Sequence, residues 1–274
     1  MRTLAHISDL HFSDVTASLT EALAADLHEQ NPDLLIVSGD LTQRARRRQF
    51  ALATAYLARL PGRKLVVPGN HDIPLFDVVR RFMMPLERYR QYVCADLQPA
   101  HIDDELAILG ISTARPITWW WDGFWRDGRV SDEQAHAARM FFAGIPPHLF
   151  RILVTHHPFS VPPRHPRRRI VHNARAMLAA IAQAGGVDLL LAGHLHTPYW
   201  RQLLAAGGPS TRPTVCALAG TAISTRVRRE PNCYNVITVN AADFAIATRT
   251  WTGARFEQTA QQQFARTVAA TVRT

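Results

Sequence analysis

Five short apolar runs, each followed directly by polar residues, are the dominant pattern in this sequence. Val, Ile and Leu fill most of their positions, and the runs cover residues 2–7, 34–37, 64–67, 152–154 and 189–192. Continuous apolar runs of this length, bounded by Gly and Pro, are typical of strands that are buried on both faces of a sheet. We therefore expect five core strands, each ending in a polar cluster.

Helical periodicity occupies several intervals between these runs. A leucine recurs every four residues within 18–30, and an apolar stripe lies opposite four arginines within 43–60. Ser131 is placed to cap a third helix, which extends to about Phe142. Alternating strands and helices predict βαβ units, so the polar clusters should gather at the carboxyl ends of parallel strands.

The C-terminal third follows a different pattern. Residues 214–219, 234–239 and 244–251 are typical of strands joined by short turns, and they predict a second sheet that is rich in antiparallel pairs. Four apolar residues spaced by multiples of four predict a final amphipathic helix over 256–272, which docks on the core or makes a membrane or homodimer contact. These are Phe256, Phe264, Val268 and Val272. Without an internal repeat or linker, we expect one domain over residues 1–274.

The composition indicates a water-soluble, cytoplasmic protein. Of the 274 residues, 47% are apolar, and no run is long enough to cross a bilayer. The first residues enter a strand pattern directly, without a secretory leader. Three cysteines without a CxxC pair indicate reduced thiols.

The formal net charge of +9 favours anionic partners, and Lys64 is the only lysine. Arginine forks suit phosphate groups, although an arginine-biased composition explains the same count. Small anionic substrates, nucleic acid and an anionic membrane surface all fit this charge. Of these, we favour a small phosphate-bearing substrate.

The polar clusters combine into one set of potential metal ligands at the predicted sheet edge. Each residue alone would more often serve a turn or a satisfied polar contact, but the strand ends bring all of them to one rim. Residues two apart share one face of an extended chain, so both members of such a pair can reach the same ion. Imidazole and carboxylate without thiolate favour Mn, Fe or Zn, and the number of ligands exceeds the needs of one ion. The set is Asp9, His11, Asp40, Asn70, His71, His156, His157, His194 and His196.

Together these residues spell a family pattern. The blocks are Asp9-x-His11, Gly39-Asp40, Gly69-Asn70-His71-Asp72, His156-His157-Pro158 and Gly193-His194-x-His196. In this order and spacing the chain resembles the calcineurin-like metallophosphoesterases, which are dinuclear hydrolases of phosphate esters. The resemblance implies an α/β fold, a two-sheet β-sandwich flanked by helices in four layers (α/β/β/α).

The resemblance also implies two sites for divalent or trivalent transition-metal ions, with Asp40 bridging them. The first site would consist of Asp9, His11, Asp40 and His196. The second would consist of Asp40, Asn70, His156 and His194, with His156 favoured over His157 as the ligand.

By the same resemblance, a hydroxide that bridges the metals attacks phosphorus, and His71 protonates the leaving group without binding metal. Two carboxylates cannot neutralise two divalent ions, so the centre stays cationic and attracts a phosphate ester. The neutral amide of Asn70 preserves that charge. Asp72 either orients His71 or fixes the loop, and Gly69 lets the backbone turn.

Within the superfamily, the chain looks most like the bacterial class III cyclic nucleotide phosphodiesterases and their broad-specificity relatives. The alternative is a UDP-diacylglucosamine hydrolase of lipid A synthesis, which would need an apolar cap over its acyl chains. A non-catalytic binding scaffold is an alternative from another class. Loss of ligands would mark such a scaffold, and every ligand block is present.

Three segments are candidates for substrate specificity. Arg115 either reaches the substrate phosphate or is a surface arginine. Residues 119–125 hold four of the six tryptophans and either stack on a base, cover a lipid chain, pack in the core or form a dimer contact. The basic run 164–169 either steers anions at the rim or is a solvated loop.

Overall fold

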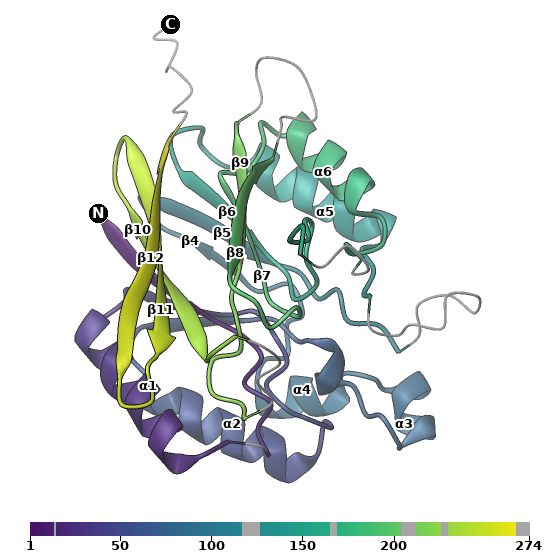
Figure 1. The fold of residues 1–274 in the computed structure, drawn as a ribbon. Coiled ribbons are helices and arrows are strands. Elements are labelled where there is room, and N and C mark those ends of the chain that lie inside the picture. Colours follow the sequence, from purple (N-terminus) through teal and green to yellow (C-terminus); the bar gives the residue numbers. More distant parts are fainter. Residues whose placement is uncertain (14, 117–126, 165–168, 204–211, 226–229, 267–274) are drawn as a thin grey trace, which may run out of the picture.

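The computed structural model describes residues 1–274 except 14, 117–126, 165–168, 204–211, 226–229 and 267–274. In the described residues, the strands form two sheets of six strands each (Figure 1). The first sheet has the order β12-β11-β10-β1-β2-β3, and the second has the order β4-β5-β6-β7-β9-β8.

The element bounds are as follows. The first sheet contains β1 (Arg2–Ile7), β2 (Leu34–Val37), β3 (Arg63–Val66), β10 (Cys233–Val239), β11 (Asp243–Trp251) and β12 (Phe256–Ala265). The second contains β4 (Ala100–Ile102), β5 (Leu106–Gly110), β6 (Phe150–Val154), β7 (Leu189–Ala192), β8 (Tyr199–Leu203) and β9 (Thr214–Leu218). The helices are α1 (Ala17–Gln30), α2 (Arg47–Arg59), α3 (Val78–Met83), α4 (Glu87–Tyr92), α5 (Asp132–Ala143) and α6 (Ala174–Gln183), with a short 3₁₀ helix at Asn70–Asp72.

Three hydrophobic cores separate four layers. Alternate residues of one strand enter different cores, because successive side chains of a strand point to opposite faces. Leu4 packs between the two sheets, whereas Ala5 packs toward α1 and α2. Ile152 likewise packs between the sheets, and Leu153 packs toward α5 and α6. Helices thus cover both outer faces (Figure 1), which confirms the predicted α/β/β/α sandwich.

Parallel pairing places the ends of the core strands together. β1, β2 and β3 run parallel in the first sheet, and β5, β6, β7 and β9 run parallel in the second. The five runs that were expected to be core strands are β1, β2, β3, β6 and β7. They belong to two sheets, so the candidate site forms where the carboxyl ends of both sheets meet.

The predicted helices near the N-terminus and after Ser131 are confirmed. α1 and α2 occupy the two periodic intervals, and Ser131 caps α5 by accepting a hydrogen bond from the Gln134 backbone N–H at 3.2 Å. None of the described helices is both long and apolar enough to cross a membrane.

Two predictions for the C-terminal third were wrong. Residues 256–265 form β12 and not a helix, and residues 267–274 lie outside the described range. The apolar positions in this segment are all separated by even numbers, so they fit a strand as well as a helix. β12 pairs with β11, where Phe264 stacks on Phe244 with ring centroids 5.1 Å apart, and this pairing decides the structure.

The C-terminal strands also do not build a sheet of their own. β10, β11 and β12 extend the first sheet next to β1, while β9 joins the second sheet parallel to β7. Strand pairing between segments far apart in the sequence determines this division, and local periodicity contains no information on it.

Candidate metal centre

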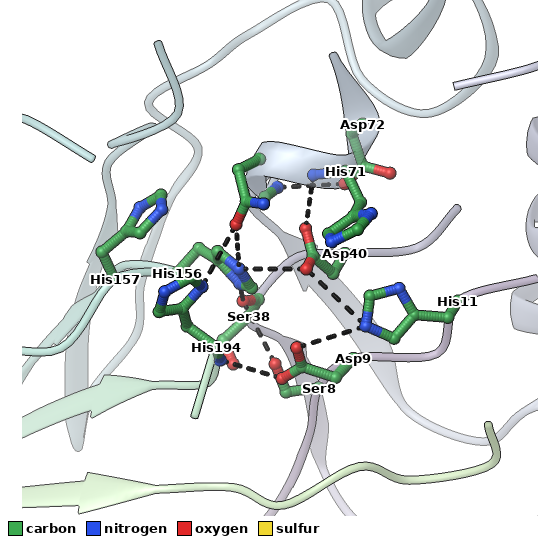
Figure 2. Close-up of polar contacts among 12 residues, drawn as sticks. Ser8, Asp9, His11, Ser38, Asp40, His71, Asp72, His156, His157 and His194 are labelled. Carbon is green, nitrogen blue, oxygen red and sulfur yellow. Dashed lines mark hydrogen bonds and ion pairs between the residues drawn. The ribbon is translucent and has the colours of Figure 1, made fainter. Parts of the chain in front are cut away.

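Polar loops from both sheets converge on one buried site (Figure 2). Within the first sheet, the Asp9 backbone N–H donates to the Gly39 carbonyl at 3.1 Å. Two bonds then join the sheets. The His156 ring donates from Nδ1 to the Ser38 carbonyl at 2.7 Å, and the His194 backbone N–H donates to Asp9 Oδ2 at 2.9 Å. The loops are therefore held together by their own backbone groups.

One group of side chains gathers around Asp9 Oδ1. This oxygen lies 3.3 Å from His196 Nε2 and 3.6 Å from His11 Nε2, and the two nitrogens are 3.4 Å apart. Asp40 closes the group, with its Oδ2 3.7 Å from His11 Nε2. The four residues are those implied for the first metal site.

A second group gathers on the other side of Asp40. Asp40 Oδ2 lies 3.3 Å from His156 Nε2. Asn70 Oδ1 lies 3.2 Å from His156 Nε2 and 3.1 Å from His194 Nδ1. The same carboxylate oxygen of Asp40 therefore faces both groups, and the structure brings together all seven residues expected to bind metal.

The donor set fits metal ions. Ligands about 2.1 Å from an ion in a tetrahedron lie roughly 3.4 Å from one another, close to the separations in both groups. Asp9 Oδ1 is fully buried and has no hydrogen-bond partner in the described part of the chain. A buried carboxylate oxygen in that state is costly unless a cation compensates it. Imidazole and carboxylate donors suit Zn, Mn or Fe, and this geometry does not select one of them.

The carboxylates and imidazoles of this site shift one another's pKa values. Burial by itself would raise the pKa of Asp9 and Asp40, but the neighbouring imidazoles lower both below their usual range. Burial likewise opposes protonation of His156, yet the Asp40 carboxylate raises the pKa of His156 to about 9. Metal ions and protons therefore compete for the same nitrogens.

Backbone strain is concentrated in the ligand residues. Five of them have positive φ, a region that residues other than glycine uncommonly adopt and that Asp and His adopt more often than most. Such strain persists only where the surrounding structure imposes it, and it is typical of functional sites. The residues are Asp9 (54°), His11 (46°), Asp40 (53°), His194 (71°) and His196 (57°).

Gly69 and Gly193 allow backbone and side chains to approach closely. Gly69 has φ −105° and ψ −178°, an extended conformation that any residue adopts, so the expectation that its conformational freedom lets the backbone turn was wrong. A Cβ atom at Gly69 would overlap Asp40 Oδ1, and one at Gly193 would overlap Ser8 Oγ and crowd Asp9 Oδ2 at 2.6 Å. The absence of a side chain is what places the two carboxylates.

Asp72 fixes the loop. Its carboxylate accepts hydrogen bonds from the backbone N–H groups of Leu41 (3.2 Å), Thr42 (2.9 Å) and Gly69 (3.0 Å). Burial, together with the charge of Asp40, raises the pKa of Asp72 to about 6. In Figure 2 its side chain points away from the metal ligands.

His71 lies beside the first group, with a ring nitrogen within 4.8 Å of ligand atoms of His11 and Asp40, so its position off the metal stays a prediction. Its ring Nδ1 donates to the Gln43 carbonyl at 2.9 Å, and its backbone N–H donates to Asp40 Oδ1 at 2.8 Å. The ring meets that of His11 edge-on, with centroids 4.8 Å apart. The Gln43 carbonyl thus performs the orienting role that was one of two expectations for Asp72.

Sequence reasoning missed Thr221. His196 Nδ1 lies 2.7 Å from Thr221 Oγ1, and this contact turns Nε2 toward Asp9. Thr221 follows β9, which pairs in parallel with β7, so its position at the carboxyl end of a core strand was the available signal. A partner of this kind fixes the ring orientation of a ligating histidine.

The other predicted residues lie near the site or outside the described range. His157 Nδ1 lies 2.8 Å from Thr113 Oγ1, with its ring centroid 4.6 Å from that of His194. Arg115 donates to the carbonyls of Ser112 and Ala114 at 3.3 and 3.1 Å, so its contact with substrate stays a prediction. The tryptophan cluster 119–125 and most of the basic run 164–169 are outside the described residues.

A family model described as calcineurin-like phosphoesterase matches residues 2–198. This range contains all five ligand blocks and covers well over half of the chain. The chain belongs to the calcineurin-like phosphoesterase family. This is the family that the sequence pattern resembles.

Individual relatives agree with this assignment. The glycerophosphodiester phosphodiesterase GpdQ of Enterobacter lignolyticus (strain SCF1) is 36% identical over 80 residues, which are 25% of this chain and 29% of GpdQ. A purple acid phosphatase, PPD1, from yellow lupin superposes with a TM-score of 0.68 at 10% identity, over 96% of this chain and 53% of the lupin chain. A dimetal phosphatase from Danio rerio superposes with a TM-score of 0.65 at 12% identity, over 98% of this chain and 99% of the Danio rerio chain. This chain thus matches under a third of the length of GpdQ and about half of the length of the lupin enzyme. The likeness to the two solved structures shows that they share the fold of this chain.

Replacing Gly69 with alanine should impair metal binding. The added Cβ would displace the Asp40 carboxylate from both groups, so we expect metal affinity to fall roughly 10- to 100-fold, as when outer-shell contacts are lost. Elemental analysis after dialysis against a weak chelator measures this. Gly144→Ala is the matched control, because its Cβ would meet no atom closer than 3.6 Å. Wild-type metal content in Gly69→Ala would contradict the close-approach argument.

Removing the hydroxyl of Thr221 should weaken metal binding while the fold remains intact. Thr221→Val keeps the shape but loses the contact with His196, and we expect affinity to drop about 10- to 100-fold. Thr221→Ser retains the hydroxyl and should bind like the wild type. Calorimetric titration of metal-stripped protein compares the variants, and equal affinities for Val and Ser would rule out the orienting role.

Proposed function

We propose that this protein hydrolyses phosphodiesters at a centre of two metal ions. The observation that carries the proposal is the position of Asp40. Its Oδ2 lies 3.7 Å from His11 Nε2 in one ligand group and 3.3 Å from His156 Nε2 in the other. One carboxylate shared between two such groups is what a dinuclear centre requires, with Asp9, His11 and His196 on one side and Asn70, His156 and His194 on the other.

The charges of the ligands favour an anionic substrate. When bound, two metal ions would polarise the phosphate and lower the pKa of a coordinated water. Asp9 and Asp40 are the carboxylates of the two groups, and Asn70 is neutral. Two divalent ions would therefore leave the centre with net positive charge, which attracts a phosphate group.

His71 is positioned to exchange a proton with the leaving group. A carbonyl oxygen can only accept, so the hydrogen bond to Gln43 fixes a hydrogen on Nδ1 of His71. Nε2 is then the atom that gives a proton to the departing oxygen when the ring is cationic. The residue is partly exposed beside the buried ligands, so substrate and water have access to it.

A diester is the favoured substrate class, because the relative GpdQ is named as a phosphodiesterase. Within this class we propose cyclic nucleotides or a broad range of small phosphodiesters. A nucleotide-linked lipid is the second candidate. It is supported by a cavity of about 440 Å³ beside Arg115, with apolar walls that include Met83, Met84 and Leu86.

A substrate panel tests the proposed function. We expect the metal-loaded protein to hydrolyse bis-p-nitrophenyl phosphate faster than the monoester, and to turn over cyclic AMP. Glycerophosphodiesters and UDP-diacylglucosamine, assayed in parallel, separate the alternatives. Asp40→Ala, which removes the shared ligand, is the negative control. Turnover of the monoester alone would overturn the diester assignment, and no turnover of any substrate would favour a binding scaffold.

Replacing His71 with alanine should impair the proton transfer and leave the metal centre intact. We expect turnover to fall about 10²- to 10⁴-fold for diesters with alkoxide leaving groups, and much less for p-nitrophenolate, which departs without a proton. His148→Ala is the matched control, because His148 is exposed. Loss of bound metal in His71→Ala would assign His71 a ligand role instead.

A further inference from the structure

The exposed apolar side chains of this protein are concentrated in one segment. Of the twelve large hydrophobic residues that are exposed in the described part of the chain, seven lie within residues 75–84. Phe76, Val79 and Met83 are the most exposed of these, at 70%, 73% and 74%. The others are Leu75, Val78, Phe82 and Met84. Contiguous apolar surface of this kind marks an interaction site.

The helix within this segment, α3, is oriented opposite to a normal surface helix. At about 100° per residue, Val78, Val79, Phe82 and Met83 occupy one face of α3, and Arg80 and Arg81 occupy the other. The arginine face is turned to the protein. Arg81 is 6% exposed and donates to the Pro74 carbonyl at 2.9 Å, and Arg80 pairs with Asp77 at 3.3 Å. The apolar face is therefore turned to solvent, at the periphery of the molecule in Figure 1.

A row of exposed arginines adjoins this apolar face. Arg44, Arg46, Arg47 and Arg48 lie at the start of α2, whose first turn contains no acidic residue. Cations at a helix N-terminus oppose the helix dipole, so this row does not serve the stability of α2. The Arg44 guanidinium lies 5.3 Å from the ring centroid of Phe76, so the arginine row and the apolar segment 75–84 meet at this contact.

We propose that residues 75–84 and the arginine row form a docking surface for an anionic phospholipid bilayer. Phe, Val and Met side chains that enter the region between headgroups and acyl chains lose their contact with water, while arginines beside them meet lipid phosphates. Both unfavourable features, the apolar face in water and the cations at a helix N-terminus, are relieved by the same partner.

Charge favours a bilayer over the other occupants. A second copy of this chain would bring an identical arginine row against the first in a two-fold contact, and like charges would repel. Nucleic acid would pair with the arginines but would leave the apolar face of α3 in water. An anionic lipid surface satisfies both parts.

The docking surface also borders the metal centre. Gln43, whose carbonyl holds His71, precedes Arg44 directly, and Asp72 is separated from Leu75 by two residues. A bilayer bound to residues 75–84 would therefore lie next to the site where phosphate is expected to bind. Docking itself does not depend on the proposed hydrolysis.

Vesicle co-sedimentation of the protein, residues 1–274, tests the proposal. We expect the protein to pellet with phosphatidylcholine vesicles that contain about one-third phosphatidylglycerol, to pellet far less with pure phosphatidylcholine, and to be released by salt. Phe76→Ser/Val79→Ser should weaken binding about tenfold or more, because two apolar side chains no longer leave water. Ile102→Ser/Met140→Ser is the matched control, since these residues are 54% and 56% exposed elsewhere. Circular dichroism melting verifies that both variants fold.

Four outcomes would overturn the proposal. If Phe76→Ser/Val79→Ser pelleted as much as the control Ile102→Ser/Met140→Ser, residues 75–84 would not contact lipid. Equal pelleting with both kinds of vesicle would remove the role of the arginines. A dimer in light scattering that Phe76→Ser/Val79→Ser dissociates, without vesicle binding, would identify a second copy as the partner. Binding to a short DNA duplex but not to vesicles would identify nucleic acid.

Discussion

The confinement of two carboxylates among imidazole nitrogens in a buried site is the constraint on which the rest of the structure depends. Asp40 illustrates it: Oδ1 accepts the His71 backbone N–H, while Oδ2 faces nitrogens of both ligand groups. Acceptors at such distances repel one another unless cations or protons lie between them. The positive φ angles occur in the ligand residues themselves, and Gly69 and Gly193 leave room for the carboxylates of Asp40 and Asp9. They are consistent with a site held in place for metal ions.

The position of the centre between two sheets gives it a structural as well as a chemical role. Asp9 and Asp40 follow strands of the first sheet, and His156 and His194 follow strands of the second. Ions bound among them would add a link between the carboxyl ends of the two sheets, which are also joined by the core that contains Leu4 and Ile152 and by the hydrogen bonds of His156 and His194. Metal binding and the packing of the sheets should therefore be coupled, because ligands from both sheets must be in place at once.

The Gly69-Asn70-His71-Asp72 stretch shows how tertiary contacts divide roles among neighbouring residues. Gly69 makes room for Asp40, Asn70 faces His156 and His194, and Asp72 holds three backbone N–H groups of the loop. His71 is partly exposed beside these residues. Sequence spacing predicted that these residues lie together, but the partner of His71 is a carbonyl of Gln43, and a backbone carbonyl has no signature in the sequence.

The sequence by itself determined the core strands and the polar residues that follow them. Runs of Val, Ile and Leu bury both faces of a strand, and parallel strands bring the residues after them to one edge, so it was predictable that Asp9, His11, Asp40, Asn70, His156, His194 and His196 lie together. The four layers, and the division of these residues between two metal sites, followed from the family resemblance. Tertiary structure alone decided that β12 is a strand, since even spacing fits both periods and pairing with β11 resolves it. It also decided the contact of Thr221 with His196 and the exposure of the apolar face of α3. Each of these depends on the surface that a residue meets, which local sequence does not encode.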